Sequence, residues 1–254
     1  MWRVSKRLSA LRASVEHLSE VAARLTVSDY SSRAYPSEWT IADTFSHLGS
    51  GAVIGRRRFE DSVTGREVDP AFNAAVWDEW NAKEPAAQVR DALTSDAALL
   101  DLLEGATKEE RTGFSLSMGP YAFDFDGFVG LRLGEHVLHT WDVEVTRNDA
   151  ATLSEEAANA ILDGVAFVVA RAGRPTGEEK SVTVRTSDAA RDFTLILQPD
   201  SVTLHEARYD RDTDLLVPAE AFVRLIYGRL DARHCPPSVN EEVVSYLRGV
   251  FPGF

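Results

Sequence analysis

One helical segment with polar residues on its inward face constrains the fold most. It runs from about Phe125 to Val145. Its apolar residues recur at helical spacing, as Phe128, Leu131, Leu138 and Val145. Glu135 interrupts this stripe, and His139 follows one helical turn later, so both side chains project from the same face. Such groups inside a helix bundle need a partner that offsets their desolvation. A divalent metal would do so, and Glu/His ligation suits zinc.

A second helical segment offers a third ligand. Thr40 and Asp43 have the spacing of a capping box that opens a helix. His47 lies on the shoulder of the apolar stripe that follows. Gly49 and Gly51 follow shortly after it, and we expect them to leave space beside the imidazole for a bound small molecule.

Each of these features also has a simpler interpretation. His47 could be a hydrogen-bonded structural histidine. Glu135 and His139 could form an ordinary pair on a helix face. His136 is a further possible ligand, but it points about 100° away from Glu135 around the helix, which ranks it below His139.

The pattern predicts an α+β protein whose first part, residues 1–150, is a four-helix bundle. The four helices are expected near residues 2–25, 41–65, 85–103 and 125–145. An irregular connection with Pro70, Trp77 and Trp80 would join the second helix to the third, and a loop over 105–124 would precede the fourth.

Residues 151–254 predict a small α+β domain. Strands are expected at 181–186, 193–197 and 201–205, and helices at 153–169, 218–227 and 239–247. Gly228 suits the end of a helix, which leaves Arg229 at the start of a loop. An arginine there could clamp a carboxylate with two hydrogen bonds, or it could be an ordinary surface residue.

Charge and cysteine content exclude several classes of function. The chain has 27 basic and 40 acidic residues, a net charge of -13, so nucleic acids and anionic membranes are not expected partners. The single cysteine, Cys235, rules out an intramolecular disulfide and fits a cytoplasmic protein. The sequence shows no membrane-spanning run, secretory signal, phosphate-binding loop, nucleophile elbow or HExxH helix. It does not predict an oligomeric state.

Two motifs resemble those of the mycothiol-dependent maleylpyruvate isomerase family, part of the larger DinB-like four-helix-bundle group. They are Trp-Thr-x-x-Asp-x-x-x-His-Leu, ending at Leu48, and Glu-x-x-x-His-x-Trp-Asp, ending at Asp142. The resemblance implies a DinB-like metal-binding bundle in which His47, Glu135 and His139 bind zinc and leave a fourth position open. It also implies that Arg229 serves the active site, and we expect Asp142 to orient a ligand imidazole.

The same resemblance implies an isomerase that uses mycothiol as thiol cosubstrate. The thiolate would add to the activated double bond of maleylpyruvate, permit rotation, and leave to give fumarylpyruvate. A thiol S-transferase acting on electrophiles would use the same residues. Two alternatives belong to other classes of function. One is a zinc-binding sensor without turnover, and the other is a metal-free bundle with a buried polar network.

Overall fold

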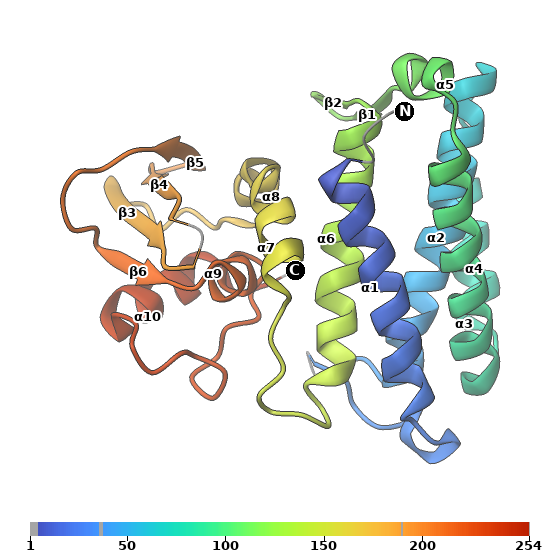
Figure 1. Ribbon diagram of the computed structural model, residues 1–254, viewed down its shortest axis with the longest axis horizontal. Helices are drawn as coiled ribbons and strands as arrows, with labels where there is room; N and C mark the ends of the chain where they lie inside the picture. Colours follow the sequence, from blue (N-terminus) through green and yellow to red (C-terminus); the bar gives the residue numbers. More distant parts are fainter. Residues whose placement is uncertain (1–4, 36–37, 189, 254) are drawn as a thin grey trace. The chain divides into compact units, whose positions relative to one another are not determined.

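The computed structural model describes residues 5–35, 38–188 and 190–253 (Figure 1). The chain divides into two compact units, Met1–Ala151 and Thr152–Phe254. Trp2 and Val4, which the sequence places in the first helix, lie outside the described residues, as do Pro36 and Ser37. None of the helices within the described ranges combines the length and the apolar character that a membrane span requires.

The first unit is a bundle of long helices. They are α1 (Lys6–Ala23), α2 (Ile41–Thr64), α4 (Pro85–Gly105) and α6 (Phe125–Glu144). Helix α1 packs against α6 and α4, and α2 packs against the same two helices. Therefore α4 and α6 occupy opposite corners of the bundle, with the core between them. The expected four-helix bundle is confirmed.

Local sequence signals set the ends of the helices that matter most. The capping box predicted for α2 is present: the Thr40 hydroxyl accepts from the Asp43 amide at 3.1 Å, and the Asp43 carboxylate accepts from the Thr40 amide at 2.9 Å. Helix α2 ends at Gly65, whose φ of 65° is left-handed. Asp124 caps α6 by accepting from the Gly127 amide at 2.8 Å. Capping satisfies amides that a helix leaves unpaired at its start.

Two connections in this unit are more regular than the sequence suggested. The segment with Trp77 and Trp80 forms a helix, α3 (Phe72–Asn81), not an irregular connection. Val76 and Trp80, four residues apart, are buried on its inner side, whereas Trp77 is exposed. The expected loop over 105–124 contains a helix and a hairpin: α5 (Lys108–Gly113), β1 (Leu116–Met118) and β2 (Tyr121–Phe123). A short 3-10 helix, η1 (Val27–Asp29), follows α1.

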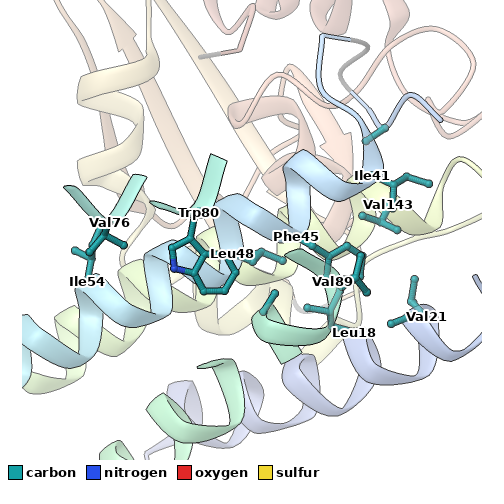
Figure 2. Close-up of a cluster of buried hydrophobic side chains, with 13 residues drawn as sticks. Leu18, Val21, Ile41, Phe45, Leu48, Ile54, Val76, Trp80, Val89 and Val143 are labelled. Atoms are coloured by element: carbon teal, nitrogen blue, oxygen red, sulfur yellow. The ribbon is translucent and has the colours of Figure 1, made fainter. Parts of the chain in front are cut away.

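The apolar core of the bundle joins side chains from α1, α2, α3, α4 and α6 (Figure 2). Phe45 and Leu48 of α2 lie among them, on either side of His47 in the sequence. The helix that carries His47 is thus fixed by burial of its neighbours, while the imidazole lies on the shoulder of the apolar stripe.

The second unit is a four-stranded sheet with helices. The strands are β3 (Lys180–Thr186), β4 (Asp192–Leu197), β5 (Val202–Ala207) and β6 (Leu215–Val217), in the order β5-β4-β3-β6. Antiparallel pairs join β3, β4 and β5, and β6 runs parallel to β3. The helices are α7 (Glu155–Leu162), α8 (Val165–Ala172), α9 (Ala219–Ile226) and α10 (Glu241–Val250). This arrangement confirms the expected α+β class.

Two details of the second unit differ from expectation. The single helix expected over 153–169 is two helices, because Gly164 leaves helical geometry at φ -130° and ψ 7°. Strand β6 was not expected, since three residues carry too little pattern to be recognised without their partner β3.

Candidate metal centre

His47, Glu135 and His139 come together between α2 and α6. The Nε2 atom of His47 lies 3.1 Å from Oε2 of Glu135, and Nε2 of His139 lies 3.6 Å from the same oxygen. One ligand atom from each residue lies within 4.8 Å of the other two. Among the described residues this is the one group of three or more His, Cys, Asp or Glu side chains that could hold a metal ion.

The geometry and chemistry of this cluster fit zinc. With bonds of about 2.0 to 2.1 Å, neighbouring ligand atoms of a tetrahedral zinc ion lie roughly 3.3 Å apart. The two separations from Glu135, 3.1 and 3.6 Å, bracket that spacing. Two imidazoles and one carboxylate form a donor set of catalytic zinc sites, which keep a fourth position for water or substrate. The Glu135 side chain is 50% exposed and that of His47 37% exposed, so a small molecule can reach them.

The electrostatics of Glu135 favour its ionised, ligating form. Partial removal of water from around the half-exposed carboxyl group acts to raise its pKa. The hydrogen bonds and charges of His139 and His47 act in the opposite direction and hold the pKa well below its usual value. A carboxylate beside two imidazoles is the protonation state that metal binding needs.

Asp142 holds the second imidazole. Its Oδ2 atom lies 2.8 Å from Nδ1 of His139, and its side chain is 1% exposed. This is the contact that the sequence led us to expect. A carboxylate at Nδ1 keeps the proton on that nitrogen and leaves Nε2, the nitrogen beside Glu135, to bind a metal.

Trp39 forms an aromatic wall against both histidines. Its ring stacks on His139, with centroids 5.5 Å apart and planes 22° apart, and lies 5.0 Å from the His47 ring. The loop that carries it is tied down by backbone hydrogen bonds: Ala34 donates to the Trp39 carbonyl at 2.9 Å, and Tyr35 donates to the Asp142 carbonyl at 3.0 Å. Nothing in the sequence indicated this role, although Trp39 begins the first motif.

Gly49 and Gly51 do not open space beside His47, contrary to expectation. A Cβ atom at Gly49 would lie 2.2 Å from the Trp80 ring and 2.9 Å from the Cα atom of Ala92. A Cβ atom at Gly51 would lie 2.8 Å from Nη1 of Arg132. These glycines therefore permit close packing of other groups against α2.

His136 is turned away from the cluster into the bundle core. It is fully buried, with Nδ1 2.8 Å from the Ser14 hydroxyl and Nε2 3.3 Å from Oδ2 of Asp96. The residue types are those of a Ser-His-Asp triad, but complete burial denies a substrate access to them. Burial also lowers the pKa of His136, more than Asp96 raises it, which keeps the imidazole neutral. Ranking His136 below His139 as a ligand agrees with this geometry.

Arg132 joins the same buried group. Its Nη2 atom donates to Oδ1 of Asp96 on α4 and, at 2.9 Å, to the carbonyl of Leu48 on α2. Arg132 precedes Glu135 by three residues, so helical spacing places both near one face. That spacing was the available signal, but nothing in the sequence identifies Asp96 as the partner.

Arg229 and Cys235 belong to the second unit. Helix α9 ends as predicted: Gly228 has a left-handed φ of 72°, and the Arg229 amide donates to the Arg224 carbonyl at 2.7 Å. The Arg229 side chain donates from Nη1 to the Tyr227 carbonyl at 2.8 Å. Its role in substrate binding stays a prediction. Sγ of Cys235 lies 3.5 Å from the Glu241 carboxylate.

Comparison with known proteins adds a family and a fold. Residues 11–144, which include all three clustered side chains, match the family described as "Mycothiol maleylpyruvate isomerase N-terminal domain". A crystal structure of the mycothiol-dependent maleylpyruvate isomerase superposes with a TM-score of 0.64 at 15% identity, covering 92% of this chain and 95% of that one. A histidine-to-alanine mutant of the mycothiol-dependent maleylpyruvate isomerase gives 0.63 at 15% identity, with 88% of each chain covered. No curated protein matches the chain. At this identity, the structural likeness establishes the fold.

Proposed function

The chain belongs to the mycothiol maleylpyruvate isomerase N-terminal domain family, and from that premise we propose that it is a zinc- and mycothiol-dependent cis-trans isomerase of the maleylpyruvate isomerase type. The observation that carries the proposal is the convergence of His47, Glu135 and His139 on one point between two helices of the family-matched region.

His47, Glu135 and His139 would hold the metal. Zinc with an open fourth position supplies one kind of chemistry here, since it lowers the pKa of a thiol that takes that position. Asp142 keeps the His139 ring in the tautomer and orientation that ligation needs. Trp39 restricts the motion of both imidazoles by packing against them.

The reaction itself needs a nucleophile and stabilisation of negative charge. The mycothiol thiolate forms a carbon–sulfur bond with the double bond of maleylpyruvate, and the displaced electron pair is delocalised as an enolate. Rotation about the resulting single bond follows. The enolate then re-forms the double bond in the trans geometry and expels the thiolate, so the thiol is regenerated.

An anionic substrate needs a local positive site on this protein. The net charge of -13 makes the surface as a whole repulsive to a dicarboxylate. We assign Arg229 the role of binding a substrate carboxylate, because the guanidinium offers a planar pair of donors that also stabilises developing negative charge. This assignment comes from what the family resemblance implies for Arg229, whose Nη1 atom donates to the Tyr227 carbonyl at 2.8 Å.

The test is conversion of maleylpyruvate to fumarylpyruvate by the zinc-loaded protein, with and without mycothiol and with and without prior chelation. We expect turnover only when both zinc and mycothiol are present. Glu135→Ala should lose activity. Glu144→Gln should keep it, because Glu144 lies on the same helix but pairs with the partly exposed His17, outside the cluster.

Activity that survives chelation and the Glu135→Ala change would contradict the proposal. The product distinguishes the nearest rival, because an S-transferase yields an adduct that retains the thiol, whereas an isomerase returns the thiol unchanged.

A further inference from the structure

One buried polar network links all four long helices of the bundle. Ser14 contributes from α1, the Leu48 carbonyl from α2, Asp96 from α4, and Arg132 with His136 from α6. Since α4 and α6 occupy opposite corners, the Arg132–Asp96 ion pair crosses the core of the bundle. Arg132 is the one member that binds two other helices with a single nitrogen, Nη2.

The pair is buried and charged. The side chains of Arg132 and Asp96 are 8% and 1% exposed. Burial acts to raise the pKa of the Asp96 carboxyl, but the charge and hydrogen bond of Arg132, together with the nearby His136, outweigh it and hold the pKa below its usual value. A buried ion pair is a poor device for stability, because apolar residues of similar size can often replace it without loss. Stability alone therefore does not explain the Arg132–Asp96 ion pair.

The network involves residues next to the candidate metal ligands on both α2 and α6. The α2 carbonyl that Arg132 holds belongs to Leu48, the residue after His47. On α6, Arg132 precedes Glu135 by three residues, and His136 precedes His139 by three. Arg132 therefore connects α2 and α6 close to His47 and Glu135, the two ligands whose separation depends on the spacing of these helices.

Gly51 makes this tie possible. A side chain at that position would place its Cβ 2.8 Å from Nη1 of Arg132. The guanidinium is held by two acceptors, so it cannot move aside without losing one of them. Three residues on three helices, Gly51, Asp96 and Arg132, thus depend on one another.

We propose that Asp96 and Arg132 are positioning residues that fix the separation of α2 and α6 at the metal centre, and that they set its affinity and geometry for zinc. The inference rests on the proposed function, since it takes His47, Glu135 and His139 as the zinc ligands. Neither Asp96 nor Arg132 is itself a ligand. They act by holding the two ligand-bearing helices at the spacing that a tetrahedral site requires.

The test replaces the ion pair by an apolar pair, Asp96→Val with Arg132→Met, which leaves no unpaired buried charge. Thermal unfolding of the metal-free protein measures stability, and competition with a chromophoric chelator measures zinc affinity. Visible absorption of the Co²⁺-loaded protein reports coordination geometry. We expect unfolding near the wild-type temperature, about 10-fold weaker zinc binding, and an altered Co²⁺ spectrum. A folded double variant with wild-type zinc affinity and an unchanged spectrum would overturn the inference.

A second pair of variants decides the question if the double variant does not fold. Gly51→Ala crowds Arg132. Gly55→Ala, one turn further along α2, would have Leu99 and Phe128 as its nearest neighbours, at 3.3 Å or more. We expect weaker zinc binding in Gly51→Ala and wild-type binding in Gly55→Ala. Equal, wild-type affinities in both would contradict the positioning role. Absence of zinc binding by the wild type is a different result, which removes the proposed function and the inference with it.

Discussion

The Nδ1 atom of His139 lies 2.8 Å from Oδ2 of Asp142, three residues further along α6. One turn of helix therefore carries a candidate ligand and the carboxylate that orients it. Because Nδ1 is engaged, the imidazole presents Nε2 to Glu135, 3.6 Å away. Partners of this kind raise the basicity of a metal-binding histidine and fix its ring.

The first prediction concerns that carboxylate. Asp142→Asn keeps the shape of the side chain and removes its charge, so we expect zinc affinity to fall about 10-fold while the protein stays folded. Glu144→Gln is the matched control, because Glu144 also pairs with a histidine, His17, but contributes nothing to the cluster. Chelator competition measures both. Equal affinities in the two variants would show that Asp142 does not support a ligand.

The second prediction concerns the ligands themselves. We expect about one zinc per wild-type chain and much less in His47→Ala and Glu135→Ala, since each removes one of three donors. His17→Ala, which changes a partly exposed histidine outside the cluster, should keep the full zinc content. Metal analysis after dialysis against weak chelator gives the stoichiometry. Full zinc retention in both ligand variants would exclude these residues from the site.

Part of this site could be predicted because helical geometry is local. Glu135, His139 and Asp142 lie on one helix, so their spacing in the sequence determines that their side chains are neighbours. The approach of His47 to Glu135 spans 88 residues. The helical pattern offered His47 as a candidate third ligand, and the family resemblance then grouped it with Glu135 and His139. The two motifs also predicted the fold of the bundle.

The remainder depended on contacts that no local pattern encodes. From the sequence we expected Gly49 and Gly51 to leave free space beside His47. Trp80 and Arg132 pack against these glycines, and no local pattern in the sequence places them there. Asp96 reads as an ordinary polar residue of a helix until Arg132 meets it across the core. Strand β6 is similar, since its three residues become a strand only through pairing with β3.

The third prediction is that Asp96→Asn destabilises the protein by about 3 kcal/mol, because it leaves the buried Arg132 charge without its partner. The folded-state pKa of Asp96 lies below its unfolded value. Its contribution to stability is therefore present above about pH 4 and is lost as the pH falls through the folded pKa. In urea unfolding, the difference in the free energy of unfolding between wild type and Asp96→Asn should become smaller below about pH 4.

Asp101→Asn provides the control for that experiment, since Asp101 is an exposed aspartate on the same helix. We expect its stability to follow the wild type at every pH. If the difference in the free energy of unfolding between Asp96→Asn and wild type stays constant down to about pH 2, Asp96 does not titrate as the ion pair requires.

The fourth prediction is that Arg229→Lys raises KM for maleylpyruvate about 10-fold, as expected when a charged hydrogen bond is lost, while zinc content stays normal. Lysine keeps the charge but loses the planar pair of donors. Arg233→Lys, a change at an exposed arginine four residues later, should leave KM unchanged. Unaltered kinetics in Arg229→Lys would remove this residue from substrate binding.

The last prediction is that Cys235 is dispensable and that the reacting thiol is supplied from outside the chain. Burial raises the pKa of the Cys235 thiol, and the neighbouring Glu241 carboxylate raises it further, so the reactive thiolate is disfavoured. In the adjacent His234, the Nδ1 atom lies 2.8 Å from Oδ1 of Asp231, so this ring nitrogen is engaged by Asp231. We therefore expect Cys235→Ser to isomerise maleylpyruvate at the wild-type rate when mycothiol is present, and both proteins to be inactive without it. Activity that needs no added thiol and disappears in Cys235→Ser would instead make Cys235 the nucleophile.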